Sequence, residues 1–460
     1  MPAAGGADNA RSYNGGMDAR GSALGLSVGP PLRGALAPPG SKSIAQRALL
    51  AAALAQGRTL LLGLPDGEDV AAALELVAAL GCAPRPAAGG GLELRGRPPA
   101  AGGPRLEQPL PVGESGTLAR LATAAVALCA APGVRVTLEA RGTLLRRSSA
   151  PLFEALRAAG AGLQGTGWPV TVQPAHPPSS VRLVAPVSSQ EVSALLLALG
   201  AWPGERRIEV AGAIPSRPYV ELTRSVLGRF GLRVDEAPTP DGCAFGVHGP
   251  LAAPSAPLAV EPDASLAAVA LAAGCLSGGE VHVPGLESAS AQGDVRILEH
   301  LRAFGCRAAP GPDGLRAGGL PVQAARLDLA GEPDLAPVLA IVAAAAALHA
   351  PAGAARSLLT GLGTLPGKES SRIEVLARGL ASCGWEVEAG VDSLAVGPAR
   401  GDLRTPRRLD PQGDHRMAFA FALLGLLRAD VLVAQPGCVA KSWPRFWDDL
   451  RALGARMLAG

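Results

Sequence analysis

The chain repeats one signal six times, and this repeat limits the folds open to it. At intervals of about 70 to 80 residues a helix-like stretch ends in an L-x-x-x-G-like stop. Glycine suits such stops because it tolerates the left-handed conformation that ends a helix. The glycines are Gly81, Gly160, Gly231, Gly305, Gly384 and Gly454. We therefore expect 460 residues to fold as similar units rather than around one core.

Each unit also predicts the same order of strands and helices. A short β-branched or Leu-rich run precedes each stop by about twenty residues, at 59–63, 134–142, 208–212, 281–285, 358–361 and 431–437. An apolar helix precedes each run and begins near Ser43, Thr117, Gln190, Ser265, Leu335 or His415. In the first five units a strand or hairpin follows, such as 385–387 with 393–396. The pattern, strand-helix-strand-helix-strand, predicts an α/β protein.

Three units per domain is the natural division. The Pro- and Ala-rich loop 249–257 lies near the midpoint and predicts one crossing between domains. The turn 38–40 predicts the other, which leaves the residues before it free to pair with the C-terminal half. We expect a first domain at 41–250 and a second at 25–40 plus 258–460. Residues 1–24 lack a basic leader and an apolar stretch, which predicts a disordered tail.

Composition excludes several classes of protein. Lys plus Arg (42) barely exceeds Asp plus Glu (39), unlike the basic stripe of a nucleic-acid binder. The longest apolar run, 338–348, is too short to span a bilayer. The seven cysteines are odd in number and lack a C-x-x-C pair, which argues against a disulfide framework or a zinc site. We expect a cytoplasmic protein that binds neither nucleic acid nor membrane.

The stretch 39–47 predicts an anion site. A Pro-Gly turn opens onto an apolar helix, and Lys42, Ser43 and Arg47 lie on its first turns. The free N–H groups of that turn carry the positive end of the helix dipole, so a phosphate or carboxylate would bind there. The alternative is an ordinary serine N-cap with two solvated cations.

Polar residues recur at the start of the first helix in each unit, so six helix N-termini can face one region. Asp263 has capping as its simpler role, and Asp334 allows the same interpretation. Glu369 and Arg372 taken alone favour an exposed i,i+3 pair, and His415 favours a structural role. Cations lie at loop-to-helix junctions, near the first helix of a unit for Lys42, Arg47, Arg120 and Arg416, and around the second helix for Arg147, Arg217, Lys368, Arg372 and Lys441. A cleft lined by them suits a ligand with several anionic groups, and the nearby acids suit proton transfer.

These motifs together resemble the 5-enolpyruvylshikimate-3-phosphate (EPSP) synthase family from about Leu36 to the C-terminus. The motifs are P-G-S-K-S-x-x-x-R at 39–47, G-x-S-G-T-x-x-R at 113–120, S-S-Q at 188–190, S-R-P-Y at 216–219, P-D at 333–334, K-E-x-x-R at 368–372, D-H-R-M-A at 414–418 and A-K-S at 440–442. Their order and spacing carry the resemblance. It implies an inside-out α/β barrel of two domains, each with three βαβαββ units, which close on substrate.

The resemblance also implies a reaction and a site. The enolpyruvyl group of phosphoenolpyruvate would pass to the 5-hydroxyl of shikimate 3-phosphate by addition and elimination, in a monomer, without cofactor or metal. Shikimate 3-phosphate would be held by Ser43, Arg47, Ser188, Ser189, Gln190, Ser216, Tyr219, Asp334 and Lys368. Phosphoenolpyruvate would be held by Lys42, Gly116, Arg147, Gln190, Glu369, Arg372, Arg416 and Lys441. Asp334 and Glu369 would handle protons, assisted by Lys42 and Lys441; which group moves which proton stays open.

Four positions depart from the family pattern. Glu114 stands where many members have Asn, Leu121 and Ser148 where Pro is usual, and Thr364 where some members bind the sugar phosphate with Asn. We expect activity to survive, with shifted affinities for phosphoenolpyruvate and its analogue glyphosate.

Two alternatives stay open. One is the related transferase that acts on UDP-N-acetylglucosamine, which usually carries a cysteine in the loop corresponding to 141–147, where this chain has none. The other is a non-catalytic repeat protein that binds phosphorylated ligands.

Overall fold

Six four-stranded sheets with one strand order make up the β structure of the computed structural model, which describes residues 23–104, 106, 109–349, 356–400, 403 and 405–460. In the second unit, β6 (Leu110–Gly113) lies parallel to β7 (Val136–Ala140). Next comes β9 (Val170–Gln173), antiparallel to β7, and then β8 (Gly162–Gln164) at the edge. The described strands thus form open sheets, and the predicted α/β class is confirmed.

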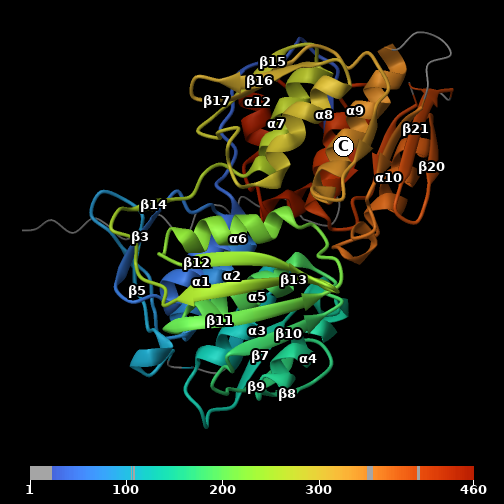
Figure 1. Ribbon diagram of the computed structural model, residues 1–460. Helices are drawn as coiled ribbons and strands as arrows, with labels where there is room; N and C mark the ends of the chain where they lie inside the picture. The colour runs from blue at the N-terminus through green and yellow to red at the C-terminus, as the bar shows by residue number, and fades with distance from the viewer. Residues whose placement is uncertain (1–22, 105, 107–108, 350–355, 401–402, 404) are drawn as a thin grey trace, which may run out of the picture.

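The units form two lobes (Figure 1). The first lobe contains β14 (Leu258–Ala259), α1 (Lys42–Leu54), β3 (Arg58–Leu62), α2 (Glu68–Ala79), β4 (Arg85–Pro86) and β5 (Leu92–Arg95); η1 (Pro99–Ala101), β6, α3 (Gly116–Cys129), β7, η2 (Gly142–Arg146), α4 (Ala150–Ala158), β8 and β9; and β10 (Ser180–Val184), α5 (Ser189–Gly200), β11 (Gly204–Ala211), α6 (Pro218–Gly228), β12 (Arg233–Thr239) and β13 (Gly242–Gly249).

The second lobe repeats the same order. It contains β2 (Arg33–Ala35), α7 (Ala264–Leu276), β15 (Glu280–Pro284), η3 (Gly293–Arg296), α8 (Ile297–Ala303), β16 (Arg307–Gly311) and β17 (Gly314–Gly318); β18 (Arg326–Asp328), η4 (Pro333–Leu335), α9 (Ala336–His349), β19 (Ser357–Thr360), η5 (Leu365–Gly367), α10 (Arg372–Ser382), β20 (Trp385–Ala389) and β21 (Leu394–Ala399); and β22 (Arg407–Leu409), α11 (His415–Leu424), β23 (Val431–Ala434), η6 (Pro436–Lys441), α12 (Phe446–Ala452), β24 (Arg456–Ala459) and β1 (Ala23–Ser27).

The chain passes between the lobes twice. The first strands, β1 and β2, pair with β23 and β24 and with β15, so the segment before residue 38 joins the C-terminal half. The return differs from the prediction, because β14 pairs with β3 and Val260 packs in the first core. Residues 258–260 therefore lie with the first lobe. Ala23 and Leu24 already belong to β1, and the rest of the predicted tail, 1–22, lies outside the described residues.

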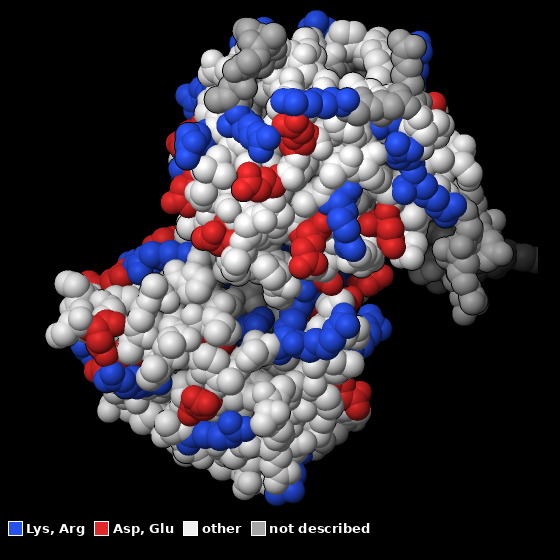
Figure 2. Space-filling model, turned by 90° about the vertical axis from the view of Figure 1, so that its right-hand side faces the viewer, with Lys and Arg blue, Asp and Glu red and all other residues white. Residues whose placement is uncertain are grey.

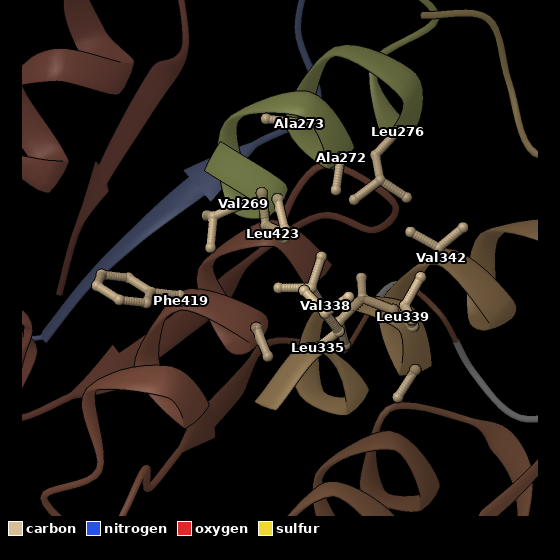
Figure 3. Close-up of a cluster of buried hydrophobic side chains, with 14 of the residues drawn as sticks. Val269, Ala272, Ala273, Leu276, Leu335, Val338, Leu339, Val342, Phe419 and Leu423 are labelled. Carbon is tan, nitrogen blue, oxygen red and sulfur yellow. The ribbon is translucent and has the colours of Figure 1, made fainter. Parts of the chain in front are cut away.

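The first helices of the units form the interior of each lobe. In the second lobe α7, α9 and α11 pack against one another, and Figure 3 shows their side chains meeting in a cluster. Every residue of α7 is buried, which explains why this helix is apolar on all sides. Figure 1 shows β15 to β17 and β20 to β21 at the periphery of that lobe. None of the described helices combines the length and apolar character needed to cross a membrane.

The glycine stops behave as predicted. All six have a positive φ, between +77° and +105°. At the first of them, Gly81 follows the C-cap Leu80, and the next amide, Cys82 N, donates to the carbonyl of Val77 at 2.9 Å. All six predicted strands are present as β3, β7, β11, β15, β19 and β23. The sixth unit adds β24 after its stop, where the sequence predicted no strand.

Candidate active site

A cavity of about 650 Å³ lies between the lobes and is lined by residues of both. Figure 2 shows Lys and Arg side chains gathered at the narrowing between the lobes, close to Asp and Glu side chains. The predicted site residues in its wall are Lys42, Ser43, Gly116, Arg147, Ser188, Ser189, Gln190, Ser216, Tyr219, Asp334, Lys368, Glu369, Arg372 and Arg416. The structure thus brings together most of a set scattered over more than 370 residues of sequence.

Helix N-termini reach the cavity from five of the six units. They are the starts of α1, α3, α5 and α11 and the short η4 ahead of α9. The sixth, the start of α7, is absent from the wall, so the expectation of six helix starts is corrected to five. Asp263 caps α7 by accepting from Ser265 N and Leu266 N at 3.0 and 3.1 Å, which confirms the capping interpretation.

Arg372 joins three carboxylates in the second lobe. Its side chain is 1% exposed and donates from Nη1 to Asp334 Oδ1 at 2.7 Å, from Nη2 to Glu369 Oε2 at 2.7 Å and from Nε to Asp414 Oδ2 at 2.8 Å. The interpretation of Glu369 and Arg372 as an exposed pair is wrong, because both side chains are enclosed between the lobes. A buried guanidinium with three charged partners fixes the relative positions of all three acids.

Asp334 binds cations and caps no helix. Its Oδ1 also lies 3.4 Å from Lys368 Nζ, and its Oδ2 lies 3.4 Å from Arg416 Nη2. Tyr219 on α6 donates its hydroxyl to the same Oδ2 at 3.4 Å, so this contact joins the two lobes. Although burial opposes ionisation, Arg416, Lys368 and Arg372 hold the pKa of Asp334 well below its usual range.

Glu369 is the second acid of the cavity wall. Its Oε1 lies 3.4 Å from Arg147 Nη2 of the first lobe and 3.6 Å from Lys441 Nζ of the second. Burial opposes its charge, but Arg372, Arg147 and Lys441 hold the pKa of Glu369 well below its usual range. Both acids are therefore ionised at neutral pH before any ligand enters.

Lys42 lies on the first turn of α1 and pairs with Asp69 on α2, with 2.9 Å between Nζ and Oδ2. Burial opposes the ammonium, but Asp69 and Glu369 raise the pKa of Lys42. The sequence analysis missed Asp69, since an acid in the first turn of a helix is an ordinary feature.

Lys441 lies just behind the cavity wall and meets an acid from each lobe. Besides Glu369, its Nζ lies 3.3 Å from Glu114 Oε2. Glu114 Oε1 accepts from Thr143 N at 2.7 Å, and Thr143 Oγ1 accepts from Arg147 Nη2 at 2.7 Å. Although burial opposes its charge, the bonds from Thr143 and the nearby Lys441 lower the pKa of Glu114. This unusual acid therefore adjoins two of the predicted phosphoenolpyruvate-binding cations.

Lysine occurs at only three positions in the chain, Lys42, Lys368 and Lys441. Each of the three pairs with a carboxylate at the cavity. Apart from histidine, every other basic side chain in the chain is an arginine. Lysine therefore occurs only beside the cavity, and arginine supplies the positive charges elsewhere.

Arg47 is a predicted site residue that is buried and does not line the cavity. Its Nε donates to Thr223 Oγ1 at 2.7 Å and its Nη1 to Ser43 O at 2.9 Å, while Nη2 has no hydrogen-bond partner among the described residues. Burial lowers its pKa to about 10. In this structure Arg47 supports the turn that carries Ser43, and direct contact with substrate stays a prediction.

Gln190 is held on both sides within the first lobe. Its Oε1 accepts from Arg120 Nη1 at 2.8 Å, and its Nε2 donates to Thr117 Oγ1 at 2.8 Å. Arg120 also donates to Ser148 O at 2.8 Å and stacks 5.5 Å from the centre of the Trp168 ring. Burial lowers the pKa of Arg120 to about 10, so the guanidinium stays charged at neutral pH. Its contacts fix the wall that carries Gln190.

His415 and Thr364 also line the cavity. The ring of His415 packs edge-on against Phe419, with 6.0 Å between ring centres. Burial and the nearby Lys42 lower the pKa of His415 well below its usual range, so the ring is neutral. Thr364 Oγ1 is buried and has no partner among the described residues. A polar group of this kind is available to a ligand.

Comparison with known families agrees with this geometry. A family model described as EPSP synthase (3-phosphoshikimate 1-carboxyvinyltransferase) matches residues 27–450. The chain belongs to the EPSP synthase family. The family and the enzyme class predicted from the sequence motifs are thereby confirmed.

Curated relatives of this EPSP synthase family member cover nearly its whole length. A protein of Ralstonia nicotianae named 3-phosphoshikimate 1-carboxyvinyltransferase is 35% identical over 94% of this chain and 99% of its own. Proteins of the same name from Bordetella petrii and Methanopyrus kandleri are 37% and 36% identical, over 90% and 92% of this chain and 93% and 96% of their own.

Solved structures share the fold. The EPSP synthase of Acinetobacter baumannii superposes with a TM-score of 0.76 at 22% identity and covers 96% of this chain and 100% of its own. The enolpyruvyl transferase NikO of Streptomyces tendae gives a TM-score of 0.69 at 17% identity and covers 95% and 98%. The two-lobed arrangement of six sheets is thus the fold of EPSP synthase family members.

Proposed function

We propose that this EPSP synthase family member transfers the enolpyruvyl group of phosphoenolpyruvate to the 5-hydroxyl of shikimate 3-phosphate and releases phosphate. The observation that carries the proposal is the buried cluster in which Arg372 holds Asp334 and Glu369 between the lobes. Each acid has further cations around it, and the cavity between the lobes is large enough for two small anions. The names of the relatives agree with this activity.

Shikimate 3-phosphate would occupy the side of the cavity near Asp334. Tyr219 and Lys368 both contact that carboxylate, which leaves the hydroxyl oxygen of Tyr219 as an acceptor and the ammonium of Lys368 as a donor for the sugar ring and its phosphate. The other residues proposed to bind shikimate 3-phosphate supply further donors; they are Ser43, Ser188, Ser189, Gln190 and Ser216. Ser216 has φ of +50°, an unfavourable conformation for serine that is typical of functional sites.

Phosphoenolpyruvate would occupy the side near Glu369. Its carboxylate and phosphate would bind Lys42, Arg147, Arg372, Arg416 and Lys441, with the free N–H groups at Gly116 adding donors at the start of α3. These cations are already paired with protein carboxylates, so an entering anion competes with Glu369, Asp69 and Glu114 for them.

The reaction needs one base and one acid in each half. In the addition step the 5-hydroxyl oxygen bonds to the enol carbon, the hydroxyl proton goes to a base, and the methylene carbon gains a proton. In the elimination step the methyl group returns a proton, and the carbon–oxygen bond to phosphate breaks. The ionised Asp334 and Glu369 can accept protons, and the cations offset the charge of the departing phosphate.

Substrate binding would change these acids from bases towards proton donors. The pKa values of Asp334 and Glu369 are low because neighbouring cations oppose their protonation. Two anionic substrates would neutralise much of that positive charge, so both pKa values would rise in the ternary complex. Asp334 and Glu369 would then share protons with the substrates and with the lysines that they contact, Lys368 and Lys441.

Phosphate release tests the proposed function directly. We expect free phosphate when the protein is mixed with phosphoenolpyruvate and shikimate 3-phosphate, and none when UDP-N-acetylglucosamine replaces the shikimate ester. Release with the nucleotide sugar would favour the related transferase instead. Binding of shikimate 3-phosphate in a calorimeter without any turnover would favour a non-catalytic binding protein.

Glu114→Gln is expected to lower KM for phosphoenolpyruvate by about three- to tenfold, the worth of one partly buried charge interaction. Glutamine still accepts from Thr143 N, but it removes the negative charge 3.3 Å from Lys441. Steady-state kinetics at constant ionic strength measure the change, and inhibition by glyphosate should strengthen in parallel.

Glu139→Gln is the matched control. The side chain of Glu139 is exposed on β7, which pairs with β6, the strand that ends just before Glu114. It should leave both Michaelis constants unchanged. An unchanged or raised KM for phosphoenolpyruvate in Glu114→Gln would show that the charge of Glu114 does not compete with the substrate.

The proposal extends to location and assembly. The seven cysteines are all free thiols, which fits a reducing cytoplasm. Residues from both lobes of a single chain line the cavity, so one chain can form the proposed site, and we propose a monomer as the working unit. Opening and closing of two domains, the first lobe at 41–250 with residues 258–260 and the second lobe with the segment before residue 40, would admit the substrates.

A further inference from the structure

Asp294 is a buried acid that the mechanism above does not use. It lies on the short helix η3, which follows β15 and packs against the start of α7. Its side chain is almost fully buried, and one carboxylate oxygen, Oδ1, has no hydrogen-bond partner among the described residues. The other oxygen, Oδ2, accepts a hydrogen bond from the hydroxyl of Ser265. Burying a carboxylate in this way is costly, so a compensating role is expected.

Asp294 is not needed to cap the helix beside it. Asp263 accepts from the amides of Ser265 and Leu266, and Gln292 Oε1 accepts from Ala264 N at 3.0 Å. The first three amides of α7 are thus already satisfied. Capping therefore does not explain the buried carboxyl group.

A chain of polar contacts leads from Asp294 to the cavity. Arg416 Nη2 donates to Ser265 Oγ at 3.2 Å and lies 3.4 Å from Asp334 Oδ2. Because the Ser265 oxygen accepts from Arg416, its single proton is directed to Asp294. The sequence Asp294–Ser265–Arg416–Asp334 thus connects the interior of the second lobe to the proposed reaction centre.

We propose that Asp294, acting through Ser265, is a positioning residue that fixes the guanidinium of Arg416 at the phosphoenolpyruvate side of the cavity. The inference rests on the proposed function. Without this anchor, the guanidinium keeps only Asp334 as a side-chain partner among the described residues, and Asp334 is shared with Arg372, Lys368 and Tyr219. The start of α7 does not reach the cavity wall. Its role is then to hold the side chain of Arg416, which does.

The charges around Asp294 make this anchor sensitive to pH. The groups that face it are Arg416 from α11, Asp334 from η4, Asp263 at the start of α7 and Tyr219 from α6. Burial raises the pKa of Asp294 to about 7; Arg416 opposes this rise, while Asp334 and Asp263 add to it. The ionised form attracts Arg416 and is lost as the pH falls through 7. KM for phosphoenolpyruvate should therefore rise between pH 8 and pH 6.

Asp294→Asn tests the inference, because asparagine keeps an acceptor for Ser265 but cannot ionise. We expect KM for phosphoenolpyruvate at pH 8 to rise about tenfold, the worth of one charge-assisted hydrogen bond. The value of kcat and KM for shikimate 3-phosphate should change less than about threefold, and the rise of KM from pH 8 to pH 6 should disappear. Asp313→Asn is the matched control, since the side chain of Asp313 is exposed in the turn between β16 and β17 and forms an ion pair with His282.

Ser265→Ala and Ser265→Thr provide a second test should the Asp294 variant fold poorly. Alanine breaks the link and should raise KM for phosphoenolpyruvate, whereas threonine keeps the hydroxyl and should restore it. The inference is overturned if Asp294→Asn retains the wild-type KM and pH profile. It is also overturned if kcat falls and both KM values rise by similar factors while the melting temperature falls. Wild-type turnover is measured alongside, so a failure of the proposed function, with no phosphate released by the wild type, is distinguished from a failure of this inference.

Discussion

Arg372→Gln is expected to reduce kcat/KM by on the order of 10³- to 10⁴-fold and to destabilise the protein by about 3–5 kcal/mol. The substitution leaves Asp334, Glu369 and Asp414 enclosed together without the guanidinium that bonds to all three. Their mutual repulsion would also move the two proposed proton-handling acids apart. Phosphate-release kinetics measure the first effect and denaturant unfolding the second.

Acid unfolding gives a further measure of this substitution. The pKa values of Asp334 and Glu369 are held below those of an unfolded chain, so their contribution to stability is complete above about pH 5 and is lost as the pH falls. Arg372→Gln removes the share of that contribution that comes from Arg372, and the variant should unfold at a higher pH than the wild type.

Two comparisons separate charge from geometry. Arg372→Lys keeps the charge but cannot bridge three carboxylates, so we expect stability between those of the wild type and the Gln variant. Arg356→Gln is the matched control: Arg356 also pairs with two acids, Glu386 and Glu388, but on the surface. Its loss should cost less than about 1 kcal/mol. Equal effects of the two Gln substitutions would contradict the central role of Arg372.

Lys42→Met is expected to lower kcat by on the order of 10³-fold or more, to the limit of detection. In the proposed function, the ammonium at the start of α1 would both bind the anionic substrate and supply a proton. Its removal also leaves the Asp69 carboxylate unpaired at 2.9 Å from where Nζ had been, so the local charge changes from balanced to negative. Methionine keeps an unbranched side chain that is one atom shorter than that of lysine.

Binding of shikimate 3-phosphate serves as the control for Lys42→Met. That ligand is assigned to the other side of the cavity, so calorimetry should give a dissociation constant within a few-fold of the wild type. Lys42→Arg, which keeps the ion pair, should retain more binding of phosphoenolpyruvate than turnover. Retention of one tenth of wild-type kcat by Lys42→Met would exclude Lys42 from the chemistry.

Local sequence signals predicted the repeat because each signal has a local physical cause. Gly81 and its five counterparts end helices through backbone conformation alone. The residues of α7 are almost all apolar, which by itself predicts a buried helix. The motif at 39–47 placed Lys42 at a helix start without knowledge of any partner. Each of these features depends on a few residues that are neighbours in the sequence, and a sequence pattern can report such local features.

The partners of the charged groups depend on contacts between distant segments, and the sequence did not give them. Asp69 looked like an ordinary acid at the start of a helix, and Asp414 was part of a motif without an assigned role. The burial of the Glu369 and Arg372 pair comes from the meeting of the lobes, which no i,i+3 spacing reports. Arg47 and the start of α7 do not line the cavity, and their contacts with Thr223 and Arg416 come from segments far away in the sequence.

The confinement of lysine to the cavity gives this chain a chemical property of its own. A reagent that acylates primary amines has three side-chain targets in 460 residues, and all three adjoin the same cavity. Apart from one label on the α-amine of the N-terminus, the mass added to an intact molecule therefore counts the accessible lysines of the cavity, with no background from lysines elsewhere. Peptide mapping after labelling with either ligand present would then show which of the three lysines that ligand protects.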